Sequence, residues 1–189
     1  MKPLLVLLFI AFLIANKSSG QSAKRIADFD IDSFFRAQQA AALGKPFPAF
    51  KVSMNGLTVT NQLMRSKVVL VNFWFEGCLP CLVEMEALNE LQHVLKEHED
   101  FLFLSFTKDG LEAVKRVKAK YRLSFPVLAV SDKDCERLSF GNGYPTSMIL
   151  DRTGKIRYLH SGGATNKELA REFVMKELLA EVKCELAVR

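Results

Sequence analysis

Hydrophobic and polar positions along the chain follow the two periods that distinguish strands from helices. Residues 50–54 and 57–60 alternate at every second position around Asn55-Gly56, which predicts a β-hairpin. Residues 68–75 form a nearly continuous apolar run rich in β-branched and aromatic side chains, which predicts a strand buried on both faces. Apolar residues then recur at steps of three and four, which predicts a helix beginning at Cys78 and containing Leu82, Met85, Leu88, Leu91 and Leu95.

The rest of the chain continues this alternation of buried strands and amphipathic helices. Further strands are predicted at residues 101–106, 125–130, 146–150 and 155–160, and further helices at 111–121, 135–140 and 166–184. This order describes one α/β domain, assigned to residues 46–189, with a central mixed β-sheet flanked by helices and an N-terminal hairpin extension. A helical arm is predicted before it, over residues 21–45, because Gly44 and Pro46 end a helical pattern.

The first 20 residues have a pattern of their own. Lys2 supplies a positive start, residues 4–15 are an unbroken apolar run, and residues 16–20 are polar and small. This layout is typical of a secretory signal peptide. The run holds 12 residues, whereas a membrane-spanning helix needs about 20. We therefore expect cleavage after Gly20 and export to the periplasm, with an uncleaved membrane anchor as the alternative.

Charge adds little to this description. The formal net charge is +5, and the expected leader carries two lysines, so the mature chain would carry +3. Its 169 residues are enough for one domain with a substantial core. Basic residues cluster only between Lys115 and Arg122, where they alternate with apolar residues as on the solvent face of a helix. We expect no nucleic-acid partner, because no readout motif accompanies these charges.

The chain contains four cysteines, Cys78, Cys81, Cys135 and Cys184, and only the first two are close in sequence. In an oxidising compartment a C-x-x-C pair is locked, metal-bound or catalytic. Zinc would require two further ligands, and none is suggested, so no metal or other cofactor is expected. Cys135 and Cys184 are expected to be buried thiols that pack as small hydrophobes, with a disulfide between them as the alternative.

The segment from Trp74 to Cys81 joins the buried strand to the start of a helix. A thiolate in the first helical turn meets unpaired backbone N–H groups and the positive end of the helix dipole. Both should depress the pKa of Cys78 and make it nucleophilic. The two intervening residues place Cys81 close enough to attack a mixed disulfide, and Pro80 in the first turn loses no helical hydrogen bond.

These residues resemble the thioredoxin superfamily and, more closely, its exported TlpA/ResA-like branch. The resemblance covers residues 46–184 and includes the strand before the motif, Tyr144-Pro145-Thr146, the hairpin over 148–156 and the extra hairpin ahead of the first core strand. It implies a thioredoxin-like fold and thiol–disulfide oxidoreductase activity.

The resemblance also implies residue roles. Cys78 would be the attacking sulfur and Cys81 the resolving one. Pro145 would be cis, with the backbone of Tyr144 offering hydrogen bonds to an extended substrate segment. Trp74 is placed on the substrate side of the site, with packing at the end of the strand as its alternative role.

Three positions bear on how this chain differs from cytosolic thioredoxins. Asn72 replaces their buried aspartate and cannot carry protons. Glu84 lies where the TlpA/ResA-like branch keeps an acidic residue, one helical turn beyond Cys81. We hypothesise that Glu84 tunes the cysteine pKa values and relays the proton of Cys81; the alternative is a solvent-facing helix acid. Gly77 stands where many relatives carry an aromatic residue, so the partner-facing surface is expected to be barer there.

The TlpA/ResA-like branch implies that the enzyme reduces disulfides in exported proteins and is itself kept reduced by a membrane thiol-reducing donor. The haem-attachment cysteines of apocytochrome c are one such target. The main alternative is oxidation or isomerisation of folding proteins. A peroxidase is less consistent with the sequence, because Phe75 occupies the position where those enzymes have Thr. A redox-inert binding module would require neither the C-x-x-C pair nor the late proline.

Overall fold

The computed structural model describes residues 31–54 and 56–188. The predicted signal peptide and the first part of the predicted arm lie outside these residues. The chain divides into two compact units, Met1–Arg36 and Ala37–Arg189. Helix α2 spans Ile31–Ala42, so its last six residues belong to the larger unit, where Gln38 donates a hydrogen bond to the Phe140 carbonyl at 3.0 Å. The predicted boundary between arm and domain at residues 45 and 46 stays a prediction.

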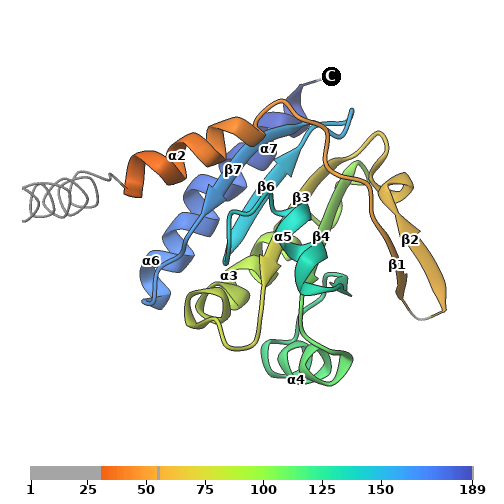
Figure 1. The fold of residues 1–189 in the computed structure, drawn as a ribbon, viewed down its shortest axis with the longest axis vertical. Helices are drawn as coiled ribbons and strands as arrows, with labels where there is room; N and C mark the ends of the chain where they lie inside the picture. Colours follow the sequence, from red (N-terminus) through yellow and green to blue (C-terminus); the bar gives the residue numbers. More distant parts are fainter. Residues whose placement is uncertain (1–30, 55, 189) are drawn as a thin grey trace, which may run out of the picture. The chain divides into compact units, whose positions relative to one another are not determined.

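The described part of the larger unit is built on a five-stranded mixed sheet with the strand order β5-β4-β3-β6-β7 (Figure 1). Strand β3 pairs in parallel with β4 and antiparallel with β6. Every residue of β3 is buried, as predicted for the central strand. The strands are β3 (Val68–Trp74), β4 (Phe101–Thr107), β5 (Val127–Ala129), β6 (Thr146–Leu150) and β7 (Ile156–Ser161).

The predicted N-terminal hairpin is confirmed as a separate two-stranded sheet. Its strands, β1 (Lys51–Met54) and β2 (Leu57–Thr60), pair antiparallel with Val52 opposite Val59. A short 3-10 helix, Asn61–Met64, then leads to β3.

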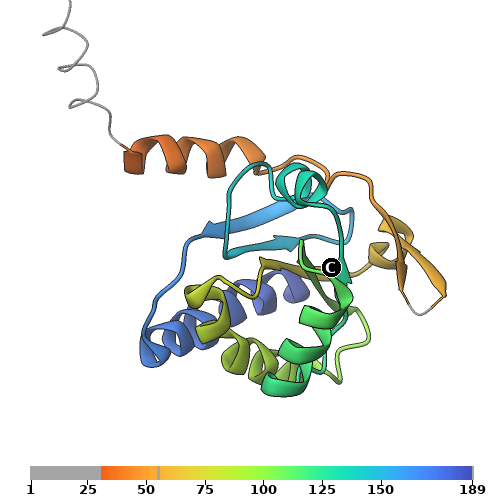
Figure 2. The same cartoon turned by 60° about the horizontal axis from the view of Figure 1, so that its bottom comes forward.

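Helices cover both faces of the large sheet (Figure 2). Successive side chains of β3 point to opposite faces, so Leu70 and Trp74 join the core that includes α3, whereas Val71 and Phe73 join the core that includes α5. The helices are α3 (Leu79–Leu95), α4 (Leu111–Tyr121), α5 (Asp132–Leu138), α6 (Lys167–Glu172) and α7 (Leu179–Ala187), with a π-helical segment at Phe173–Leu178 between the last two.

The structure differs from the sequence prediction at several element boundaries. Helix α5 begins three residues earlier than predicted, because the Ser131 hydroxyl accepts a hydrogen bond from the Asp134 N–H at 3.0 Å and caps it. Strand β5 is shorter than the predicted 125–130, and Pro126, just before it, has no N–H to contribute to a ladder. The last helix contains the π-helical segment, for which the apolar periodicity gave no signal.

Candidate active site

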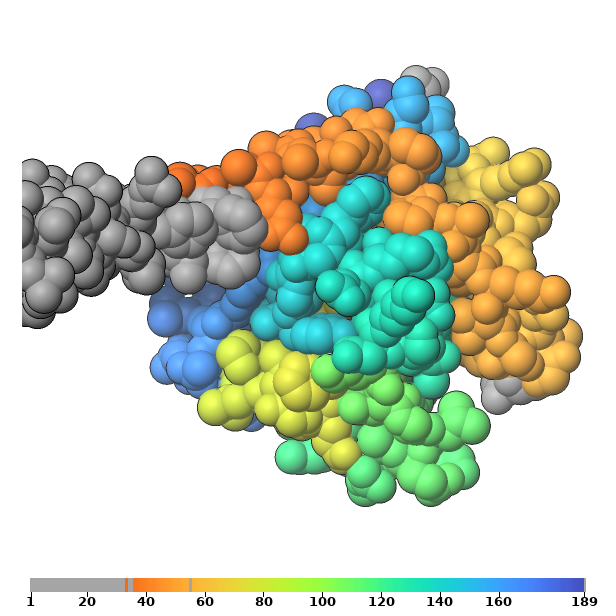
Figure 3. Space-filling view, in the orientation of Figure 1, coloured from red at the N-terminus to blue at the C-terminus, as the bar shows by residue number. Residues whose placement is uncertain are grey.

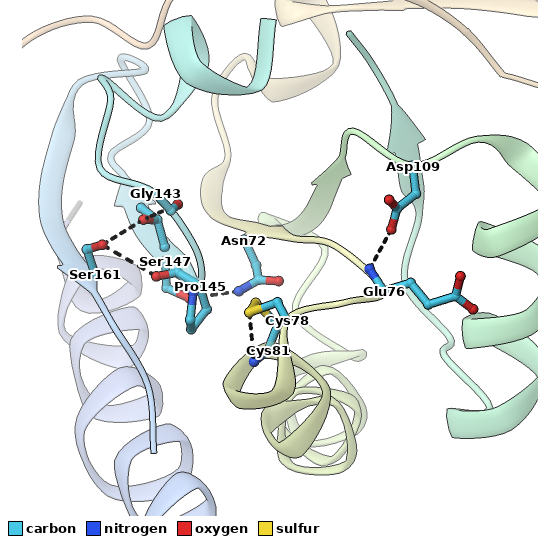
Figure 4. Close-up of a disulfide and its surroundings, with 10 residues drawn as sticks. Asn72, Glu76, Cys78, Cys81, Asp109, Gly143, Pro145, Ser147 and Ser161 are labelled. Carbon is cyan, nitrogen blue, oxygen red and sulfur yellow. Dashed lines mark hydrogen bonds between the residues drawn. A yellow bond between two sulfur atoms is a disulfide. The ribbon is translucent and has the colours of Figure 1, made fainter. Parts of the chain in front are cut away.

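Cys78 and Cys81 form a disulfide at the start of α3, with their Cα atoms 5.3 Å apart (Figure 4). Cys78 is the N-cap residue, and its sulfur accepts a hydrogen bond from the Cys81 backbone N–H at 3.3 Å. Pro80 lies in the first turn, as predicted. Cys78 is 6% exposed and Cys81 is 1% exposed. A partner can therefore reach Cys78 more readily than Cys81.

The peptide bond between Tyr144 and Pro145 is cis, which confirms the prediction for this proline. The loop that carries it is tied to the end of β7 and to its own backbone. The Gly162 N–H donates to the Pro145 carbonyl at 2.9 Å, and the Thr146 hydroxyl donates to the Gly143 carbonyl at 2.9 Å. These bonds hold the loop in place beside the disulfide (Figure 4).

Glu84 is buried, with 2% of its surface exposed, so it is not the solvent-facing acid of the alternative reading. Its Oε1 atom has no hydrogen-bond partner among the described residues. Burial raises the pKa of this carboxyl to about 8. The carboxyl lies near Pro80, the residue that precedes Cys81 in the sequence. It also lies near the ring of Pro145. The structure thus places Glu84 one turn beyond Cys81 and near the cis-proline, while its catalytic role stays a prediction.

Asn72 lies in β3 beside the disulfide (Figure 4). It is 1% exposed, and its side-chain nitrogen donates a hydrogen bond to the Ser147 hydroxyl at 3.2 Å across the β3–β6 pair. An amide cannot exchange a proton with a thiol at neutral pH. If a buried side chain relays a proton here, Glu84 has the chemistry to do so and Asn72 does not.

Trp74 lies in the core and not on the substrate side of the site. Its side chain is fully buried, and its indole N–H donates a hydrogen bond to the Ser105 hydroxyl at 2.7 Å. The indole is therefore satisfied inside the fold, as the packing alternative describes. The expected place of Trp74 on the substrate side is therefore wrong, because its fully buried side chain cannot contact substrate.

An aromatic pair next to the site was missed by the sequence analysis. The rings of Phe75 and Tyr144 meet edge to face with centroids 5.1 Å apart, and the Lys108 ammonium lies 5.0 and 5.5 Å from the two centroids. Lys108 also pairs with Asp132 at 3.0 Å. The start of α3 and the segment before β6 accordingly lie side by side on one face (Figure 3). Three segments distant in sequence contribute to this contact, so no local pattern could have revealed it.

Gly77 lets the Phe75 ring lie against the turn before Cys78. A Cβ atom placed on Gly77 would stand 2.9 Å from Cε2 of Phe75, which is closer than atoms pack. The surface at Gly77, which was expected to be bare, is therefore covered by the ring of Phe75. Phe75 and the neighbouring Tyr144, both half-buried, lie in contact at this point.

The two remaining cysteines are both free thiols, so the alternative of a disulfide between them is not observed. Cys135 is buried as expected, and burial raises the pKa of its thiol. Cys184 is exposed, contrary to the expectation. The reason is helical geometry, because Cys184 follows the buried Val182 by two residues and so points away from the core.

Within residues 31–54 and 56–188, no group of three or more His, Cys, Asp or Glu side chains is arranged to hold a metal ion. Over the same residues, no helix is both long enough and apolar enough to cross a membrane.

The chemistry available to this arrangement is disulfide exchange. A sulfur at a helix start can attack or be attacked, a second sulfur one turn inside can resolve the product, and the cis-proline loop lies alongside. Together with the thioredoxin-like sheet, this makes the protein a thiol–disulfide oxidoreductase that acts on thiol–disulfide substrates.

Comparison with known proteins places the enzyme in a family. The chain belongs to the Redoxin family, which matches residues 42–173. The thioredoxin-like protein YneN of Bacillus subtilis is 33% identical over 134 residues, covering 68% of this chain and 77% of the relative. The thiol-disulfide oxidoreductase ResA of Bacillus thuringiensis is 32% identical over 139 residues, covering 72% and 79%.

Solved structures agree on the fold. A thioredoxin-family thiol:disulfide interchange protein from Chlorobium tepidum superimposes with a TM-score of 0.56 at 23% identity, covering 72% of this chain and 98% of that one. The thioredoxin domain of a thiol-disulfide oxidoreductase from Bacteroides vulgatus gives 0.57 at 24% identity, covering 70% and 98%. The predicted thioredoxin-like fold is therefore confirmed.

Proposed function

We propose that this enzyme is exported and reduces disulfide bonds in other exported proteins. The observation that carries the direction of the reaction is the buried carboxyl of Glu84, one turn beyond Cys81 on α3. Because its pKa is about 8, this carboxyl is ionised mainly above neutral pH. Once ionised, it opposes a second negative charge on the cysteines one turn before it and so raises their pKa values. A dithiol whose thiolate is less stabilised is a stronger reductant.

The reaction begins with the reduced pair. The Cys78 thiolate attacks one sulfur of the substrate disulfide, an enzyme–substrate disulfide forms, and the other substrate sulfur leaves as a thiolate. Cys81 then transfers its proton to Glu84 in its ionised form, the minor form at pH 7 for a pKa of about 8, and attacks the Cys78 sulfur. The second substrate thiolate leaves, so the substrate gains two electrons and the enzyme is left with the Cys78–Cys81 disulfide seen in the structure.

The alternative direction rests on the hydrogen bond from the Cys81 N–H to the Cys78 sulfur. This contact and the helix dipole stabilise a thiolate at Cys78 and favour an oxidant or isomerase. The Glu84 carboxylate and the helix start therefore shift the reduction potential of the Cys78–Cys81 couple in opposite directions. The reduction potential reports their balance.

The first test is that reduction potential, measured by equilibrating the protein in thiol/disulfide buffers and following fluorescence. Trp74 is the only tryptophan and shares a core with both active-site cysteines, so its emission should report their redox state. We expect a value near or below about −230 mV, whereas about −120 to −180 mV would assign the enzyme to oxidation or isomerisation. At pH 9, where Glu84 is ionised, the Glu84→Gln variant should shift by about 30 mV or more towards the oxidising side.

Export and its consequences are supported by the leader pattern of residues 1–20 and by the resemblance to the TlpA/ResA-like branch. In that setting a membrane thiol-reducing donor would restore the dithiol after each turnover. Exported proteins with selected disulfides, such as apocytochrome c, would be the substrates. Expression of the full chain should yield a periplasmic protein whose N-terminus is Gln21; a protein that keeps Met1 and stays with the membrane would instead support the anchor.

A further inference from the structure

Gly163 lies in the connection between β7 and α6 and faces the active site. Its φ angle is outside the left-handed region, unlike that of the preceding Gly162, whose φ is +99°. The backbone at position 163 could therefore accept any L-residue. A reason for glycine here has to come from the surrounding space.

That space is already occupied by three atoms of the site. A Cβ atom on Gly163 would stand 2.5 Å from Oε1 of Glu84, 2.8 Å from Cγ of Pro145 and 3.3 Å from Cβ of Pro80. Carbon atoms pack at about 3.5 to 4.0 Å, so even a methyl group would have to move the carboxyl or the cis-proline ring. Pro145 lies beside the disulfide (Figure 4), and Glu84 is one turn beyond Cys81 on α3.

The Glu84 carboxyl is held by this packing more than by hydrogen bonds. Its Oε1 atom is buried and has no partner among the described residues. The loop that closes over it is fixed, because the Gly162 N–H donates to the Pro145 carbonyl at 2.9 Å. The shape of the enclosure therefore decides where the carboxyl lies.

We propose that Gly163 is a positioning residue. Because it has no side chain, the Glu84 carboxyl can occupy the space between the C-x-x-C turn and the cis-proline loop. Its effect on turnover rests on the proposed proton transfer from Cys81 to Glu84. Its effect on the position and the pKa of the Glu84 carboxyl does not depend on that proton transfer.

The titratable groups around this position are few. Cys78 and Cys81 on α3 are joined in the oxidised enzyme, Tyr144 precedes the cis-proline, and the His160 ring in β7 lies against Phe173 with centroids 4.3 Å apart. Burial is the cause that raises the pKa of Glu84. A displaced, better hydrated carboxyl should therefore titrate closer to its ordinary value.

The test compares Gly163→Ala with Gly110→Ala in the oxidised full-length protein. Gly110 has an ordinary φ of −69° and open space around its Cα, so alanine fits there. Carboxyl ¹³C NMR should show the Glu84 midpoint about two pH units or more lower in Gly163→Ala and unchanged in Gly110→Ala. Disulfide reduction at pH 7 should fall roughly tenfold or more in Gly163→Ala only. A Gly163→Ala enzyme with the wild-type Glu84 midpoint and pH–rate profile would overturn the proposal.

A second variant covers the case in which Gly163→Ala does not fold. Glu84→Ala combined with Gly163→Ala removes the carboxyl that the new methyl would meet, so the double variant should fold. If the double variant also fails, the Pro145 contact and not Glu84 is what position 163 protects, and the proposal is wrong. The NMR titration needs no turnover, so a wild-type protein without reductase activity would defeat the proposed function and leave this test intact.

Discussion

Replacing Cys78 by Ser is expected to abolish disulfide reduction, with a loss of about 10⁴-fold or more. Replacing Cys81 by Ser should instead stop the reaction after its first half and accumulate an enzyme–substrate disulfide at Cys78. The asymmetry follows from the structure. Cys78 caps α3 and is the more exposed of the two sulfurs, whereas Cys81 is 1% exposed and lies one residue inside Pro80. The buried sulfur can resolve a mixed disulfide but is poorly placed to form one.

The trapped species identifies the attacking sulfur directly. Cys81→Ser is reduced, mixed with a disulfide-containing test protein and examined on a non-reducing gel, with the linkage site mapped by mass spectrometry. Cys184 is exposed and free, so both variants are made in a Cys184→Ser background to remove a second accessible thiol. That background alone should keep wild-type activity. A mixed disulfide at Cys81 in Cys78→Ser, or full activity of Cys78→Ser, would reverse the assignment.

The parts of this molecule that sequence predicts well are those whose geometry is local. Strand β3 was predicted within one residue because a run buried on both faces has a distinctive composition. The chemistry of Cys78 and Cys81 followed from their spacing at the junction of that strand with α3. Because the two cysteines are three residues apart at the start of a helix, Cys78 caps the helix and Cys81 lies within its first turn.

The parts that were missed depend on segments far apart along the chain. Helical periodicity put Glu84 one turn beyond Cys81, but its burial depends on Pro145 and Gly163, some 60 and 80 residues later. No local pattern marks Gly163, which lies between β7 and α6, as part of the site. Trp74 was placed on the substrate side because its contact with Ser105, in the neighbouring strand, leaves no mark in the local sequence.

Glu84→Gln is expected to change how the stability of the oxidised enzyme depends on pH. The pKa of Glu84 is raised from 4.5 to about 8 by burial. Between these values the native state binds more protons than the unfolded state, so wild-type stability falls as pH rises through this window. A shift of this size corresponds to a loss of about 4 kcal/mol relative to Glu84→Gln between pH 4 and pH 9.

The measurement is chemical denaturation of both proteins at several pH values with the Cys78–Cys81 disulfide intact. These two sulfurs then do not titrate. His160, whose pKa burial lowers, contributes equally to both proteins. Glu86→Gln is the matched control, because Glu86 is on the same helix but exposed and paired with Lys167 at 3.1 Å. Parallel wild-type and Glu84→Gln curves would show that Glu84 is not a buried acid.

The same substitution separates burial from catalysis. The slope of stability against pH requires only that Glu84 be buried, whereas a changed pH–rate profile requires that it exchange a proton during turnover. If Glu84 accepts the proton of Cys81, Glu84→Gln should lose the ionisation near pH 8 from the rate profile and slow the release of substrate from the mixed disulfide. If the stability slope disappears and the rate profile does not move, Cys81 loses its proton to water, and the buried carboxyl acts only on the charge balance of the two sulfurs.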